Sequence, residues 1–340
     1  MYEFIINCKN NTRLFSEARV TSKSGTVTMD AKQQLHVYRR WDDGFVIRRM
    51  MRGEERQVIR WFGTLEPMPC DLELAIDLRG DYLDVDSFFA GELNGEMVAS
   101  LIRTPVADDL TYIGAIYVDE RHRKLGFAQR MIITAQEVEE RSHRTATSVI
   151  DSYDHLVSMY EKFGYKSADK ITTYQGTASP IAALDRFGIN VRKVADADFD
   201  RLMSYDDKCF IRPGSKWRRE LLARWMKIPG GHAVVAVNCQ GDVVGYGCRR
   251  PSVTVAEHHF IGPLYADSYS ISWDLIQQLT SDVIGQTIIM TVVQTNNEAL
   301  RLVDEMKLQP TVRLIRMFNG QPVSLSRQVV AVTNDTVCAF

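Results

Sequence analysis

A basic run at residues 121–124 is followed closely by Gly126 and Ala128, just ahead of a segment with helical periodicity. The first amides of a helix have no acceptors inside the helix, and the helix dipole adds about half a positive charge there. Small residues let a phosphate approach the backbone, and the basic side chains add full charges. The pattern therefore predicts a cradle for a pyrophosphate, although an ordinary solvated turn before a helix has the same residues.

A strand and a helix are expected to hold this loop. The apolar run at residues 112–118 contains β-branched residues and predicts a buried strand. After the loop, apolar residues recur at helical spacing, which predicts a helix; they are Phe127, Met131, Ala135 and Val138. Asn94-Gly95 predicts a hairpin between strands at 88–93 and 97–102.

The rest of the first half is expected to contain helical pieces at 53–62 and 71–78 and strands at 147–150 and 171–174. A second helix is predicted by an apolar stripe that ends at Gly164, where a left-handed residue is favoured; the stripe is Leu156, Met159, Tyr160 and Phe163.

The second half of the chain is predicted to repeat this plan. Gly114-Ala-Ile-Tyr-Val-Asp119 parallels Gly262-Pro-Leu-Tyr-Ala-Asp267, and the later stripe parallels Ala299, Leu302, Val303 and Met306. Helices are expected around 197–205, 216–226, 273–283 and 298–306, with strands at 233–237, 243–247, 260–265, 287–293 and 312–317.

The domain organisation follows from this repeat. We expect an N-terminal extension at 1–42, a first domain at 43–178, a linker at 179–188, a second domain at 189–325 and a tail at 326–340.

With these elements in place, residues 117–128 resemble motif A of the GNAT acetyltransferases, which is a strand, then Arg/Gln-x-x-Gly-x-Gly/Ala, then a helix. Residues 160–165, Tyr-Glu-Lys-Phe-Gly-Tyr, resemble the end of motif B. The resemblance covers about residues 45–175, and the second half resembles a diverged copy, as in tandem-GNAT proteins. It implies an α/β (α+β) fold of two GNAT-like domains, each a mixed, mostly antiparallel twisted sheet flanked by helices.

The resemblance also implies a cofactor, acetyl-CoA or another acyl-CoA. The backbone of Ile116, Tyr117 and Val118 would pair with the pantetheine arm, beside a bulge that splays this strand from its neighbour. The pyrophosphate would lie on the segment after it; the residues are Arg123, Lys124, Leu125, Gly126, Phe127 and Ala128.

Tyr160 matches the family's tyrosine that faces the departing thiolate, although its place on the apolar stripe also suits a core residue. The family often has asparagine seven residues earlier, bonded to the pantetheine, and here Tyr153 stands there. The second half keeps that asparagine, Asn296, but has Val303 instead of the tyrosine. It also lacks glycine and arginine after Asp267, and we interpret it as a degenerate copy.

Acyl transfer to an amine needs a base, because a lysine-like amine has a pKa of about 10.4. The central strand at 112–118 contains no carboxylate, which the family often places there. Glu92, Asp151 and His155 are the candidates, and a water chain is the alternative. No cysteine–histidine pair or serine triad indicates covalent catalysis.

Composition sets the remaining limits. The formal charge is −2, which is a poor match for a general nucleic-acid binder. The six cysteines lack zinc spacing, so no metal site is expected and reduced thiols in the cytoplasm are predicted. No apolar stretch approaches the roughly 20 residues of a membrane span.

The sequence thus favours an N-acyltransferase that moves an acetyl group from acetyl-CoA to a small-molecule or peptide amine by direct attack in a ternary complex. A non-catalytic CoA-binding protein is the alternative. An aminoacyl-tRNA-dependent tandem-GNAT transferase is a third hypothesis, which needs the basic residues near a predicted helix to form a surface; they are Arg212, Lys216, Arg218, Arg219 and Arg224. The acceptor and the oligomeric state are left open.

Overall fold

The computed structural model describes residues 36–65, 87–141, 147–182, 188–210, 214–323 and 332–333. The predicted helix at 71–78 lies outside these ranges, as do most of the expected extension at 1–42 and tail at 326–340. No helix in the described ranges is both long and apolar enough to cross a membrane.

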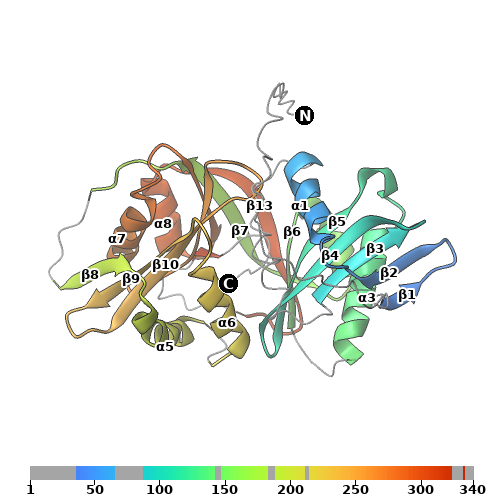
Figure 1. Ribbon diagram of the computed structural model, residues 1–340, viewed down its shortest axis with the longest axis horizontal. Coiled ribbons are helices and arrows are strands. Elements are labelled where there is room, and N and C mark those ends of the chain that lie inside the picture. Colours follow the sequence, from blue (N-terminus) through green and yellow to red (C-terminus); the bar gives the residue numbers. More distant parts are fainter. Residues whose placement is uncertain are drawn as a thin grey trace, which may run out of the picture. The chain divides into compact units, whose positions relative to one another are not determined.

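The described elements follow one order twice (Figure 1). The first half contains β1 (Val37–Arg40), β2 (Phe45–Arg49), α1 (Glu55–Arg60), η1 (Trp61–Leu65), β3 (Phe88–Leu93), β4 (Glu96–Ala107), β5 (Leu110–Val118), η3 (Glu120–His122), α3 (Phe127–Arg141), β6 (Thr147–Ser152), η4 (Asp154–Leu156), α4 (Val157–Glu161) and β7 (Lys166–Thr177). The second contains β8 (Ile189–Lys193), η5 (Asp196–Asp198), α5 (Phe199–Cys209), α6 (Lys216–Trp225), β9 (His232–Asn238), β10 (Val243–Pro251), β11 (His258–Ala266), α7 (Tyr269–Thr280), β12 (Thr287–Val293), α8 (Asn297–Glu305), β13 (Gln309–Asn319) and β14 (Val332–Thr333).

Local signals placed most of these elements correctly. Asn94 and Gly95 have φ angles of 52° and 82°, which is the left-handed conformation that their hairpin turn requires. Gly164 follows α4 with φ of 86°, as expected for a helix end. The sequence analysis missed the hairpin of β1 with β2 and the strand β8, which have no clean two-residue alternation of buried and exposed positions.

The strands form one mixed sheet in the order β1-β2-β3-β4-β5-β6-β13-β7-β12-β14-β11-β10-β9-β8, and most neighbours are antiparallel. Strand β13 of the second half lies between β6 and β7, while β7 of the first half lies between β13 and β12 (Figure 1). Each half therefore completes its sheet with a strand of the other half, β13 for the first half and β7 for the second.

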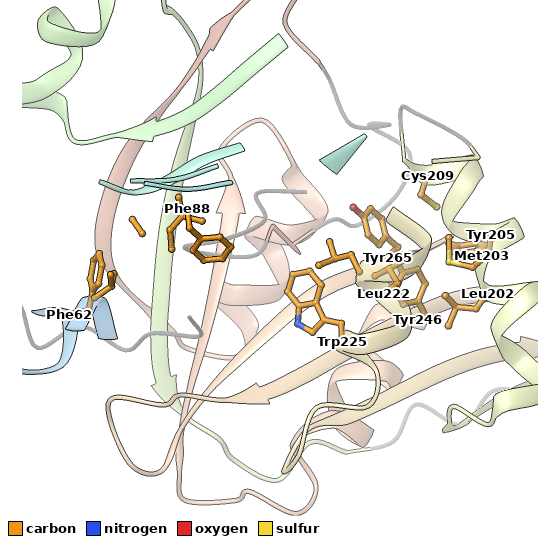
Figure 2. Close-up of a cluster of buried hydrophobic side chains, with 14 of the residues drawn as sticks. Phe62, Phe88, Leu202, Met203, Tyr205, Cys209, Leu222, Trp225, Tyr246 and Tyr265 are labelled. Atoms are coloured by element: carbon orange, nitrogen blue, oxygen red, sulfur yellow. The ribbon is translucent and has the colours of Figure 1, made fainter. Parts of the chain in front are cut away.

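Helices cover both faces of this sheet. Phe127 and Met131 of α3 and Tyr160 of α4 pack with Ile113 and Ile150 in one buried cluster. The opposite face of β5, including Tyr117, belongs to another cluster that extends to α5 and α6. Figure 2 shows residues of that cluster from both halves, with Phe62 and Phe88 from the first and Trp225, Tyr246 and Tyr265 among those from the second.

A buried ion pair lies within the second-half part of that cluster. Arg218 of α6 donates to Asp206 of α5 from Nε at 3.0 Å and from Nη2 at 2.8 Å, and both side chains are almost fully buried. The hydroxyl of Tyr246 also donates to Asp206. Arg218 thus serves the packing of two helices against the sheet.

Candidate active site

The predicted anion cradle is a loop that runs from the end of β5 to the start of α3. The Asp119 carboxylate accepts a hydrogen bond from the Arg121 amide at 3.0 Å and begins the short helix η3. Lys124 and Gly126 then have φ angles of 66° and 80°, so the chain turns twice through the left-handed region before α3 begins. Such a turn points successive amides toward one side, which makes a concave anion site.

The amides of this loop are available to a ligand. The first bond of α3 joins the Arg130 amide to the Gly126 carbonyl at 3.1 Å. Among the residues that the structure describes, no acceptor faces the amides of residues 124–129. A side chain built on Gly126 would meet only Gln129, at 3.9 Å, so the space beside this glycine is open. These features fit a pyrophosphate group.

The basic side chains of the loop have different environments. Arg121 donates to Asp119 and to Glu96, each at 3.0 Å, and its guanidinium group holds the pKa of Asp119 below its usual range. Arg123 bonds the Val118 carbonyl at 3.1 Å and lies over the ring of Tyr117 at 5.5 Å. No ion pair to Lys124 occurs within the described ranges, so this side chain carries its charge at the loop.

The next part of the site is a notch between β5 and β6. Ala115 has φ of 48°, and the pairing of β4 with β5 shifts there, so β5 contains the expected bulge. Ser100 holds the bulge through a bond of 2.9 Å to the Ala115 carbonyl. The parallel pairing of β5 with β6 stops at Tyr112 and Val149. Beyond that point, no described strand pairs with this edge of β5.

The three predicted pantetheine-binding residues all lie on this open edge. Ile116 and Val118 pack toward the core beneath α3, and Tyr117 points to the opposite face. There the Tyr117 ring stacks on Trp61 at a centroid distance of 4.7 Å. The strand that forms one wall of the notch thus runs directly into the loop before α3, which brings the two predicted binding segments together.

Tyr160 lies on α4, and only 5% of its surface is exposed. Its ring meets Tyr165 edge to face at 6.0 Å, and burial raises the pKa of its hydroxyl to about 12. Tyr160 belongs to a buried hydrophobic cluster, and Ile116 and Val118 pack against that cluster. Tyr153, which replaces the family's asparagine, is 38% exposed and stacks on His155 at 5.8 Å.

The two candidate carboxylate bases are each held in an ion pair. Glu92 accepts from Arg48 at 2.7 Å, and Arg48 also forms two bonds of 2.7 Å to Glu54. Asp151 accepts two bonds of 2.9 Å from Arg316 of β13, and both side chains are almost fully buried. Arg48 and Arg316 were not predicted as site residues, because nothing local in the sequence marks either as a partner of these carboxylates.

The second half has equivalent backbone positions that are occupied by different residues. Gly262 and Pro263 form the counterpart of the bulge, since Leu264 pairs with Gly247 and Ile261 with Arg249. The Asp267 amide bonds Val244 at 3.0 Å, as the Asp119 amide bonds Val98 at 2.9 Å. These equivalent contacts confirm the predicted repeat.

Comparison with known proteins gives the same result. The model of the acetyltransferase (GNAT) family matches residues 56–165, and that of an acetyltransferase (GNAT) domain matches residues 202–330. Holothin acyltransferase of Pseudoalteromonas sp. (strain SANK 73390) is 22% identical over 288 residues, which are 83% of this chain and 90% of that protein.

Two solved structures have the same fold. A GCN5-related N-acetyltransferase from Sphaerobacter thermophilus matches with a TM-score of 0.62 at 17% identity, over 81% of this chain and 95% of that one. A tandem GNAT protein from the clavulanic acid biosynthesis pathway matches with a TM-score of 0.60 at 12% identity, over 82% of this chain and all of that one. The chain therefore belongs to the GNAT acyltransferase family, with two GNAT domains in tandem.

Proposed function

We propose that the protein is an N-acyltransferase that moves an acetyl group from acetyl-CoA to a small-molecule amine in a ternary complex. The observation that carries this proposal is the continuity of the notch and the cradle. The open edge at Ile116–Val118 leads directly into the free amides of residues 124–129. An extended chain of amides that ends in a pyrophosphate, such as coenzyme A, matches both parts.

The residues of this chain would divide the binding as follows. The backbone of Ile116 and Val118 would pair with the amides of the pantetheine arm. The amides around Gly126 and the start of α3 would hold the pyrophosphate, with Lys124 adding a full charge. The exposed ring of Tyr153 would lie against the pantetheine in place of the family's asparagine.

The chemistry requires a neutral amine. Its nitrogen attacks the thioester carbon, the C–N bond forms, the C–S bond breaks, and the thiolate leaves. Deprotonating an amine of pKa about 10.4 near pH 7 costs roughly 4–5 kcal/mol, whereas a thiolate of pKa about 8.5 costs about 2 kcal/mol. The proton of the attacking nitrogen passes to Glu92, Asp151 or a water chain, and the Tyr160 hydroxyl donates a hydrogen bond to the leaving sulfur.

Burial keeps Tyr160 suited to that role. With its pKa raised to about 12, the hydroxyl holds its proton throughout the range in which amines react. It therefore remains a hydrogen-bond donor while the sulfur acquires negative charge.

The likeness to a holothin acyltransferase supports a small-molecule acceptor. The basic residues of α6 offer less support for a nucleic-acid partner. Arg218 is buried against Asp206, and Arg219 is paired with Asp200. Arg212 lies outside the described residues.

A second candidate is a protein that binds an acyl-CoA without turning it over. The ion pairs of Glu92 and Asp151 favour it, because either carboxylate would have to leave or share its arginine to collect a proton.

One experiment separates these functions. Acetyl-CoA binding is measured by calorimetry, and release of CoA is then followed with a panel of primary amines. Binding together with amine-dependent CoA release supports the transferase. Binding without release for any amine supports the second candidate, and absence of binding contradicts both.

A further inference from the structure

The notch of the second half is filled by a segment of the chain itself. Strands β11 and β12 pair in parallel from His258 to Ile261 and then separate, as β5 and β6 do in the first half. Strand β14 lies in the gap. Val332 pairs with Leu264 of β11, and β14 also pairs with residues 291–292 of β12, antiparallel to both strands.

The position of β14 corresponds to the open edge of the first half. In the repeat, Gly262 aligns with Gly114, so Leu264 is the counterpart of Ile116. The edge of Ile116 has no described strand beside it, whereas the edge of Leu264 is paired with Val332. One half therefore leaves this edge to a ligand, and the other covers it with a peptide.

We propose that the second notch is a peptide-binding site and that its ligand is the C-terminal segment of this chain, held by strand addition between β11 and β12. This assignment rests on backbone pairing, because strand addition satisfies main-chain donors and acceptors whatever the side chains are. It does not depend on the proposed function, since neither acyl-CoA nor turnover enters it.

The residues that line the gap are buried with β14 in place. Leu264 and Val292 are fully buried, and Thr291 is nearly so. Strands that separate inside a core leave backbone groups that water cannot reach, and each such group is costly without a partner. Strand β14 supplies partners to both sides of the gap at once.

Because β14 occupies the second notch, an acyl-CoA cannot bind there. A pantetheine arm and a peptide strand would need the same edge of β11, and β14 is covalently attached. The start of α7 is also unsuited to phosphate, because the Ser268 hydroxyl already accepts from the Ile271 amide at 3.3 Å. The second notch is therefore expected to bind one peptide, a segment of the same chain, and no acyl-CoA.

A truncated variant that ends at Val323 tests this assignment. A synthetic peptide of residues 326–340 is added to it, and binding is followed by calorimetry and by the melting temperature. We expect one-to-one binding to the truncated variant, a rise in melting temperature of about 5 °C or more, and no binding to the full-length chain. Equal binding to both proteins, or to neither, would overturn the proposal.

A matched peptide distinguishes strand addition from a side-chain contact. Methylation of the backbone nitrogens of Val332 and Thr333 removes the amide hydrogens and keeps both side chains. We expect this peptide to bind at least about tenfold more weakly. Equal affinity of the two peptides would contradict pairing through the backbone.

A second pair of variants serves if the truncated chain does not fold. The full-length double variants Val332→Pro/Thr333→Pro and Val332→Ala/Thr333→Ala are compared by hydrogen exchange of the amides in β11 and β12. We expect faster exchange around Leu264 and Thr291 in the proline variant only, because proline has no amide hydrogen. The same protection in both variants would show that β14 does not occupy the gap.

Discussion

The two strand-to-helix junctions of this protein have the same place in the fold but opposite chemistry. Before α3, the two left-handed residues Lys124 and Gly126 turn the amides outward, and no described acceptor takes them. Before α7, Ser268 caps the helix with its own hydroxyl. A helix start satisfied by its own cap is more stable but has less to offer an anion.

The helices that follow β6 in the first half and β12 in the second differ in a similar way. Asn296 accepts from the Ala299 amide at 3.0 Å and caps α8, so this asparagine serves the helix itself. Tyr153 at the equivalent place makes no side-chain cap. The same place in the two halves therefore holds a helix cap in one and an exposed aromatic ring in the other.

Replacing Gly126 by aspartate is expected to have the largest effect. A φ of 80° disfavours any side chain, and the new carboxylate would face the site of the pyrophosphate. We expect the affinity for acetyl-CoA to fall by about 100-fold or more, close to 3 kcal/mol, as measured by calorimetry. The matched change at the other junction, Ser270→Asp, should leave that affinity unaltered, and an equal loss there would erase the distinction between the junctions.

The Asp151→Asn variant is expected to lose about 3–5 kcal/mol of unfolding free energy, because it removes the negative charge that pairs with the buried guanidinium group of Arg316. Adding Arg316→Met should restore most of that loss in urea unfolding. The exposed pair of Asp196 with Lys227 supplies the control, since Asp196→Asn should change stability little.

Turnover of the restored double variant, Asp151→Asn with Arg316→Met, then decides whether Asp151 is the base. A loss of turnover of about 100-fold assigns it that role.

The Tyr160→Phe variant tests catalysis apart from binding. It keeps the ring in its packed position and removes only the hydroxyl, so stability should change little. We expect turnover to fall by about 100-fold with acetyl-CoA affinity nearly constant. Tyr165→Phe, in the neighbouring ring, is the control. If the two variants have the same turnover as the native protein, Tyr160 is only a core residue.

Replacing Asn296 by alanine is expected to cost about 1 kcal/mol of stability, through the lost cap of α8. Acetyl-CoA affinity should not change, because Asn296 serves only the second half. Exposed Asn297 offers the control, and Asn297→Ala should be close to neutral. Weaker acetyl-CoA binding in Asn296→Ala would mean that the second half still holds a cofactor.

The pH dependence should show the smallest effect. Burial raises the pKa of Tyr160 to about 12, from about 10 in an unfolded chain. Its contribution to stability is therefore present in full below pH 10 and is lost as the pH rises through about 12. Turnover should rise with amine deprotonation and show no falling limb between pH 8 and 10. A falling limb in that range, absent from Tyr160→Phe, would show that the hydroxyl ionises earlier.

The strand, the loop and the helices of the candidate site could be predicted from the sequence, because their signals are local. Each signal lies within a short continuous stretch of sequence; these are the Gly126 loop, the strand at 112–118 and the apolar stripe that contains Tyr160. The partners of the candidate bases could not be predicted in this way. Arg316 follows Asp151 by 165 residues, and the two meet only because β13 lies beside β6. No local sequence pattern indicates which half of the sheet a given strand will pair with.

The exchange of β7 and β13 also sets an order of events during synthesis. When Thr177 has been made, β6 still lacks its neighbour, and β7 has a partner on neither edge, because β12 and β13 are encoded later. At about 5–20 residues per second, the ribosome needs on the order of ten seconds to reach Asn319. Throughout that interval the nascent first half exposes unpaired strand edges, which are templates for association with other chains. The first half can complete its sheet only after β13 has been made, so these edges stay open until most of the second half has been synthesised.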